Sequence, residues 1–198
     1  MRRWTATFAR AWRALWRPSA HYSAGFLLVV AAGAGVAAWG GFHWALELTN
    51  TETFCVSCHE MRDNPFGELK ETAHFNNRTG VRATCPDCHV PKEWGAKVVR
   101  KIQATNELFH KIAGTVGTPE KFEAKRLDLA KSVWASMKAT DSRECRNCHA
   151  MDSMDLEKQL RPAKRRHLQA KEKGQTCIDC HQGIAHKLPK DWKPESSG

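Results

Sequence analysis

The sequence predicts a mainly α-helical protein with a single N-terminal transmembrane helix and little or no β-sheet. Three observations lead to this prediction. Residues 24–46 form an uncharged apolar run, and the residues after it repeat one short cysteine motif four times. Between the motifs, apolar residues recur at helical spacing and never alternate as in a strand. A chain of 198 residues is long enough for one domain and an anchor, but several domains would each be too small to bury a core.

The apolar run, AGFLLVVAAGAGVAAWGGFHWAL, contains one ionisable side chain, His43. Its 23 residues are enough for a helix to cross a hydrocarbon layer of about 30 Å. A cleaved signal peptide is the alternative, but the run is longer than the apolar core of such a peptide. We expect His43 to lie at the membrane interface rather than to bind a cofactor. Aromatic residues, which favour that interface, stand near both ends: Trp16, Tyr22, Trp39 and Trp44.

Five arginines precede the first acidic residue, Glu47. Because such a positive cluster stays on the cytoplasmic side, we expect the rest of the chain to lie in the bacterial periplasm. The expected parts are a basic cytoplasmic N-terminus (1–23), an inner-membrane anchor (24–46), a periplasmic domain (47–189) and a polar tail (190–198). The span contains four glycines that would let it pack closely against a second copy and form a homo-oligomer: Gly33, Gly35, Gly40 and Gly41. Glycine is also common in unpaired spans, so both alternatives stay open.

All eight cysteines belong to four copies of the pattern Cys-x-x-Cys-His: Cys55 and Cys58, Cys85 and Cys88, Cys145 and Cys148, and Cys177 and Cys180. This pattern is the attachment signature of c-type haem, in which the two thiols bind the porphyrin edge and the histidine binds the iron. A disulfide framework or a zinc ribbon would not need a histidine after every second cysteine. A thioredoxin-like motif would need a βαβ context. We therefore expect four covalently attached haems c.

The motifs form two pairs, because the motif histidines are 30 residues apart in the first pair, 32 in the second and 60 between the pairs. This spacing indicates an internal duplication. We expect the porphyrins to form most of the core. Residues 49–198 carry 26 basic and 20 acidic groups, an excess that two propionates on each haem would offset. No nucleic-acid partner is therefore expected, although the net charge of the chain is +10.

Two long helices are predicted between the motifs, over residues 93–112 and 119–138. An apolar stripe with alternating spacings of four and three supports the first: Val98, Ile102, Thr105, Phe109 and Ile112. An electron-carrying haem also needs a second axial ligand, usually His or Met. The candidates outside the motif positions are Met61, two residues after the first motif, and four histidines: His74, His110, His167 and His186.

Four segments carry a resemblance to a known family: CHEM at the first motif, GVRATCPDCHVP around the second, ECRNCH at the third and TCIDCHQGIAHKLP at the fourth. They resemble the NapC/NirT membrane tetrahaem quinol dehydrogenases, and the NapC branch most of all, over about residues 38–189. The resemblance implies electron transfer from membrane menaquinol or ubiquinol to the periplasmic nitrate reductase complex. A nitrite or other terminal reductase is an alternative acceptor, and a passive tethered carrier is an alternative function. A catalytic multihaem reductase is not expected, because few residues remain for a substrate pocket.

The resemblance also implies roles for individual residues. The motif histidines His89, His149 and His181 would ligate haems 2, 3 and 4, and the second ligands would be His186, His74 and His167 respectively. In one related branch, haem 4 takes a ligand from the partner protein instead. Met61 would ligate haem 1, with His59 as the alternative ligand. Lys101 and Glu107 match the quinol-site lysine and carboxylate of relatives. Asp87 could lie near a haem or cap the motif turn, and His110 is expected on a helix surface.

Overall fold

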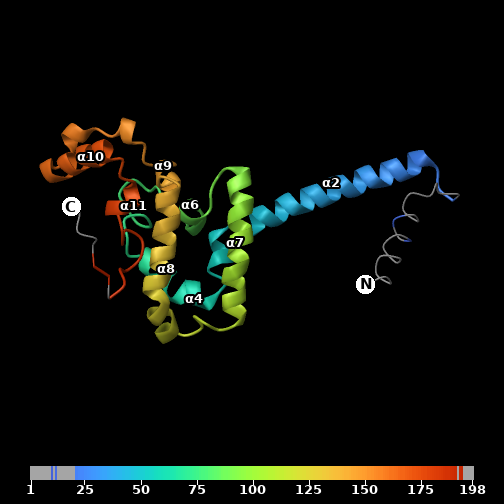
Figure 1. The fold of residues 1–198 in the computed structure, drawn as a ribbon, viewed down its shortest axis with the longest axis horizontal. Coiled ribbons are helices and arrows are strands. Elements are labelled where there is room, and N and C mark those ends of the chain that lie inside the picture. Colours follow the sequence, from blue (N-terminus) through green and yellow to red (C-terminus); the bar gives the residue numbers. More distant parts are fainter. Residues whose placement is uncertain (1–9, 11, 13–20, 191, 194–198) are drawn as a thin grey trace. The chain divides into compact units, whose positions relative to one another are not determined.

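The computed structural model describes residues 10, 12, 21–190, 192 and 193, and the chain divides into two units, residues 1–48 and 49–198. The described residues form α-helices and two short 3₁₀ helices, and they contain no strand (Figure 1). The mainly α-helical prediction is therefore confirmed. Most of the predicted N-terminal segment and tail lies outside the described residues.

The first unit contains helix α2 (Ala24–Leu48), which begins at the predicted residue and extends two residues past the predicted end. The hydroxyl of Ser23 caps its first turn by accepting a hydrogen bond from the Phe26 amide at 3.2 Å. By length and composition, α2 is the one helix of the described residues that could cross a membrane. Within it, the His43 ring packs edge-on against Trp39, with ring centroids 4.5 Å apart.

The second unit contains three longer helices, α7 (Trp94–Ile112), α8 (Pro119–Ala139) and α10 (Arg161–Lys173) (Figure 1). The first two match the predicted helices to within one residue at each end. Thr118 fixes the start of α8, because its hydroxyl accepts from the Lys121 amide at 3.3 Å and Pro119 occupies the first helical position.

Short helices carry the cysteine motifs and their neighbours. They are α3 (Glu52–Cys55), α4 (His59–Asp63), α5 (Pro65–Leu69), α6 (Cys85–His89), α9 (Arg143–Arg146) and α11 (Cys177–Cys180). The two 3₁₀ helices, Met151–Ser153 and Leu156–Lys158, lead into α10. The second and fourth motifs are thus helical through both cysteines, whereas the first motif spans the break between α3 and α4.

The second unit has a very small apolar core. Among its described residues, the buried apolar side chains are those of Leu69, Phe122 and Ile178 and of two prolines, Pro91 and Pro189. The predicted stripe of α7 is open instead: Ile102, Phe109 and Ile112 are 65%, 64% and 80% exposed. A unit of this length normally buries a contiguous cluster of apolar side chains. The polypeptide therefore leaves apolar surface for a large bound group to cover.

Candidate haem sites

The second and fourth motifs share a local design. The amide of Thr84 donates to Asp87 Oδ2 at 2.9 Å, and the amide of Thr176 donates to Asp179 Oδ2 at 2.8 Å. Each aspartate therefore closes the turn that holds its two cysteines, as in a capping box. Of the two roles considered for Asp87, the structure shows the cap.

Consecutive motifs lie beside one another. The thiols of Cys55 and Cys85 share a hydrogen bond, which lowers the pKa of Cys55 to about 7 and raises that of Cys85. Burial raises the pKa of Cys88 to about 11, and the nearby Cys145 adds to this effect. Burial and the nearby Cys177 likewise raise the pKa of Cys145. The four attachment points thus follow one another in chain order, and all eight thiols are free of disulfides.

Specific contacts hold the motifs of each pair together. In the first pair, Glu52 of α3 forms an ion pair with Arg82, just before the second motif. In the second pair, the fully buried Ser142 accepts a hydrogen bond from the Ile178 amide at 3.1 Å, and Lys138 Nζ lies 2.7 Å from Asp179 Oδ1. Ser142 and the preceding residue both have positive φ, a strained conformation for residues with a side chain. This turn places the third motif against the fourth.

Three histidines outside the motifs face the three motif histidines. The ring centroids of His89 and His186 are 6.2 Å apart, those of His74 and His149 are 6.2 Å apart, and those of His167 and His181 are 6.0 Å apart. In two of these pairs the partners come from opposite halves of the chain. His74 precedes the second motif but faces the third, and His186 follows the fourth motif but faces the second. The two halves of the unit therefore interlock.

These centroid distances can be compared with the distance expected between two imidazole rings that bind the same iron atom. A metal–imidazole bond is about 2 Å long. The ring nitrogen lies about 1.15 Å from the ring centre, given ring bonds of about 1.35 Å. Two such ligands on opposite sides of a metal would have centroids about 6.3 Å apart. The three observed spacings fit a haem iron with two histidine ligands.

The His89–His186 pair has the best-defined surroundings. Burial, helped by the facing His186, lowers the pKa of His89 to about 4 and keeps it in the neutral form that binds metals. His186 Nδ1 lies 4.0 Å from Glu68 Oε2. Glu68 is held in turn by Arg126 of α8, with Nη2 2.7 Å from Glu68 Oε1. The segment after the fourth motif is thereby tied to both α5 and α8.

The first motif differs from the others. In the described part of the chain, no second imidazole faces His59, and its Nε2 lies 3.3 Å from Glu60 Oε1. Glu60 is buried, and both of its oxygens accept from Lys111 Nζ of α7 at 2.6 Å. Burial opposes ionisation of Glu60, but the hydrogen bond from Lys111 prevails and lowers its pKa. Met61 is 37% exposed.

Sequence reasoning singled out neither Glu60 nor Lys111. Glu60 could have been noticed from its position, because it is an acidic residue directly after the first motif histidine. No local pattern marks Lys111, because the two residues are 51 positions apart in the chain.

The structure gives the two candidate quinol-site residues different partners. Lys101 Nζ donates to the Thr49 carbonyl at 2.6 Å, whereas Glu107 accepts from Arg100 at 2.6 Å and is largely exposed. Both charges nevertheless act on the Cys55 thiol, so both lie near the first motif. As expected, His110 is exposed on α7, with its Nδ1 3.2 Å from the Thr115 hydroxyl.

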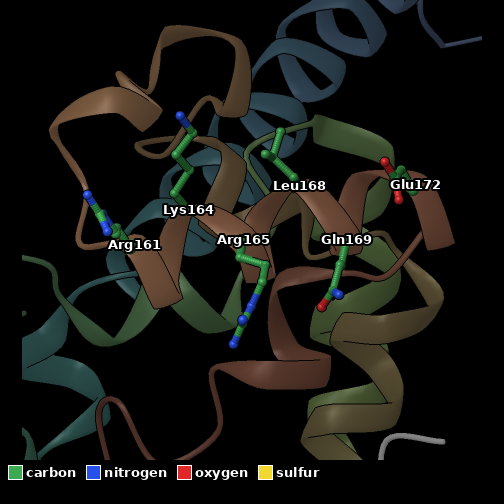
Figure 2. Close-up of a pocket in the computed structure, with 6 residues that line it drawn as sticks. All are labelled: Arg161, Lys164, Arg165, Leu168, Gln169 and Glu172. Carbon is green, nitrogen blue, oxygen red and sulfur yellow. The ribbon is translucent and has the colours of Figure 1, made fainter.

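Helix α10 presents a basic surface beside the His167–His181 pair. It contains six basic residues and one acidic residue, and His167 lies on it. A shallow groove of about 340 Å³ runs along this helix, lined by Arg161, Lys164, Arg165, Leu168, Gln169 and Glu172 (Figure 2). The groove contains none of the predicted haem or quinol residues. Its charge would attract an anionic molecule.

In the described part of the chain, no three His, Cys, Asp or Glu residues converge on one point.

Known proteins with similar sequences are c-type cytochromes or components of denitrification. Denitrification system component NirT of Stutzerimonas stutzeri is 59% identical over 179 residues, covering 90% of this chain and 89% of the relative. Cytochrome c-type protein NapC of Paracoccus pantotrophus is also 59% identical over 179 residues, covering 90% of this chain and 76% of the relative.

Cytochrome c-type protein TorC of Escherichia coli K12 is 45% identical over 181 residues, covering 91% of this chain and 46% of the relative. No solved structure gives a significant match. The NirT and NapC relatives are equally identical, so identity does not favour the NapC branch. The model of the NapC/NirT cytochrome c family, N-terminal region, matches residues 17–191. The chain therefore belongs to the NapC/NirT family of c-type cytochromes.

Proposed function

We propose that this protein is a membrane-anchored quinol dehydrogenase that passes electrons through four haems c to a periplasmic reductase. The three histidine pairs, each spaced to hold one iron, are the observation that carries the proposal. The attachment cysteines support it, because they adjoin one another in chain order and would bring successive haems close together. A single-pass α2, with the N-terminus in the cytoplasm, would hold residues 47–189 on the periplasmic side of the inner membrane.

The proposed axial ligands follow the facing histidines. His89 and His186 would hold haem 2, His149 and His74 haem 3, and His181 and His167 haem 4. Haem 1 would be held by Met61, because His59 faces a carboxylate and not a second ligand. A thioether ligand raises the potential of a haem relative to imidazole, which suits an electron acceptor for quinol.

The polypeptide would bind quinol and take up its protons. Oxidation of a quinol releases two electrons and two protons, and the bound haems supply the electron acceptor. We propose that Lys101 and Glu107 bind quinol and that the Glu107 carboxylate accepts a proton from it, because both charges lie near the first motif. Since each is engaged elsewhere in this structure, quinol binding would exchange the Thr49 carbonyl and Arg100 for the quinol oxygens.

The expected acceptor is the periplasmic nitrate reductase complex, by analogy with the NapC branch. A nitrite or other terminal reductase is the second candidate, because the NirT relative is as similar as the NapC relative. Electrons would leave at haem 4, beside the basic surface of α10.

The test uses the purified full-length protein in detergent. A pyridine haemochrome assay should return four haems per chain that survive acid-acetone extraction, and three or fewer would contradict the assignment of all four motifs. Menaquinol or ubiquinol analogues should then reduce the haems, as followed by absorbance. Addition of oxidised nitrate or nitrite reductase should reoxidise them and identify the acceptor. Reduction by dithionite but by neither quinol would indicate a passive tethered carrier.

A further inference from the structure

The first motif histidine is engaged in a way that the other three are not. The rings of His89, His149 and His181 each face another imidazole at 6.0–6.2 Å. Nε2 of His59 instead lies 3.3 Å from Oε1 of the next residue, Glu60. In a Cys-x-x-Cys-His motif, the ring nitrogens of the histidine are its only metal-binding atoms. At the first motif, one of these nitrogens is already paired with a carboxylate.

Glu60 is fixed in place by a second element. Its side chain is 4% exposed, and both of its oxygens accept from Lys111 Nζ at 2.6 Å. Glu60 belongs to α4 and Lys111 to the last turn of α7, so the ion pair joins two helices. A carboxylate held at both oxygens and shielded from water cannot easily turn away from His59.

We propose that Glu60, clamped by Lys111, is a positioning residue that engages Nε2 of His59 and thereby leaves the iron of haem 1 to Met61. An ionised carboxylate can only accept a hydrogen bond, so an Nε2 that it engages would be the ring nitrogen that carries the proton. A protonated ring nitrogen has no lone pair to give to a metal. This inference rests on the proposed ligation of haem 1 by Met61. It explains why a motif with an intact histidine would use a methionine.

The alternative role for Glu60 is purely structural, as one half of an ion pair between α4 and α7. The two roles differ in what happens to haem 1 when the carboxylate is removed. A structural pair would affect stability and leave the ligand unchanged. A positioning carboxylate would release His59, and the first haem would then acquire a histidine ligand like the others.

The test is a set of variants of the full chain, each checked for its haem content. Glu60→Ala removes the group that faces His59. Glu60→Gln is the matched control, because its amide keeps the shape and can still hydrogen-bond Nε2 while the charge is lost. Each variant is made with and without Met61→Leu. The readouts are the ligand-sensitive electron paramagnetic resonance and near-infrared signals of haem 1, and its midpoint potential.

In Glu60→Ala, the methionine signals of haem 1 should be replaced by bis-nitrogen or histidine signals, and its midpoint potential should fall. Loss of a negative charge alone would raise the potential, because a nearby anion favours the oxidised haem. The direction of the shift therefore separates a ligand change from a charge effect. Met61→Leu should disturb haem 1 in the wild-type and Glu60→Gln backgrounds, and it should be silent in Glu60→Ala.

A Met61→Leu effect that is equally large in the Glu60→Ala background would overturn the inference and leave the proposed function intact. A silent Met61→Leu in the wild-type background would instead contradict the proposed methionine ligand itself. If Glu60→Ala does not mature with four haems, Glu60→Ala/Lys111→Met gives the same test. That double variant removes both charges and leaves no unpaired buried group.

Discussion

The ring centroids of His74 and His149 lie 6.2 Å apart, although one residue precedes the second cysteine motif and the other belongs to the third. The pair joins the two halves of the unit at one point. His186 and His89 make the same kind of connection in the opposite direction along the chain. An iron atom in each of these gaps would turn two side-chain contacts into cross-links between the halves.

Substitution His74→Ala should convert one haem of the four from low spin to high spin, because it removes one ligand of the proposed haem 3. The other three haems should keep their spectra, since their ligands lie elsewhere. Electron paramagnetic resonance of the oxidised protein measures this. His110→Ala is the control, because His110 is exposed on α7 and faces no motif histidine. Equal spectra for the two variants would contradict the ligand assignment.

Met61→Leu should perturb one haem signal and strongly impair reduction by quinol analogues. The swap conserves volume, so it should cost less than about 1.5 kcal/mol in stability. The assay is the rate of haem reduction after quinol addition, with dithionite reduction as the control for total haem. If Met61 only packs against the porphyrin as an adaptable apolar side chain, the variant will behave like the wild type.

Arg126→Met should lower the free energy of unfolding by about 3 kcal/mol or more, because it leaves Glu68 buried without its cation. The side chains of Arg126 and Glu68 are each only 10% exposed. Denaturant unfolding of the haem-loaded protein measures the loss. Lys125→Met on the same helix removes an exposed partner of Asp128 and should change stability by less than about 0.5 kcal/mol. Similar losses of stability in both variants would show that the buried ion pair of Arg126 with Glu68 contributes no more than an exposed one.

Asp179→Asn should lower stability at neutral pH by about 1 kcal/mol, because it loses the ion pair with Lys138 and weakens the cap of the fourth motif. Burial opposes ionisation of Asp179, but the hydrogen bonds from Lys138 and Thr176 prevail and lower its pKa below the ordinary value of 3.8. A lowered pKa stabilises the folded state above 3.8, and this stabilisation is lost as the pH falls through the folded-state value. The gap between the two proteins should thus shrink below about pH 4. A gap independent of pH would contradict the role of the charge.

Reversal of charge on α10, as in Arg165→Glu with Arg166→Glu, should slow electron delivery to the reductase. The basic surface would attract an anionic partner at long range, and salt screens this attraction. The rate of haem reoxidation by the reductase should differ most between wild type and variant at low ionic strength. At about 1 M salt, where the screening length is about 3 Å, the rates should converge. Lys125→Glu on α8 serves as a charge-reversal control.

Local signals predicted α7 and α8 to within one residue at each end, whereas α10, the third longer helix of the second unit, was not predicted. Thr118 and Pro119 mark the start of α8, and the periodicity of α7 is visible from Val98 to Ile112. The exposure of that α7 stripe could not be foreseen, because no pattern says which element covers an apolar face. The facing histidines were implied only by the family resemblance, since composition gave four candidates with no means of pairing them.

The ion pairs of Glu60 with Lys111 and of Arg126 with Glu68 escaped prediction for a physical reason. Each joins residues more than 50 positions apart, so only the folded chain brings them together. The break between α3 and α4 within the first motif was also not expected, because that motif has the same spacing as the others. The spacing of a motif indicates which two cysteines would bind one haem, but it does not determine whether the backbone between them is helical.

The crossed histidine pairs have a consequence for the order in which the protein can mature. If residues 49–198 are exported in order from the anchor onward, His74 crosses the membrane before the third motif, and the second ligand of the proposed haem 3 would already be present when that motif arrives. The order is reversed for the proposed haem 2, whose motif would cross the membrane before its second ligand. Its second ligand, His186, follows the fourth motif, so haem 2 would keep one face open until all four motifs have crossed the membrane. The segment that follows the fourth motif and carries His186 would thus decide when the last open haem face is closed, and a truncation before His186 would leave the proposed haem 2 without its second ligand.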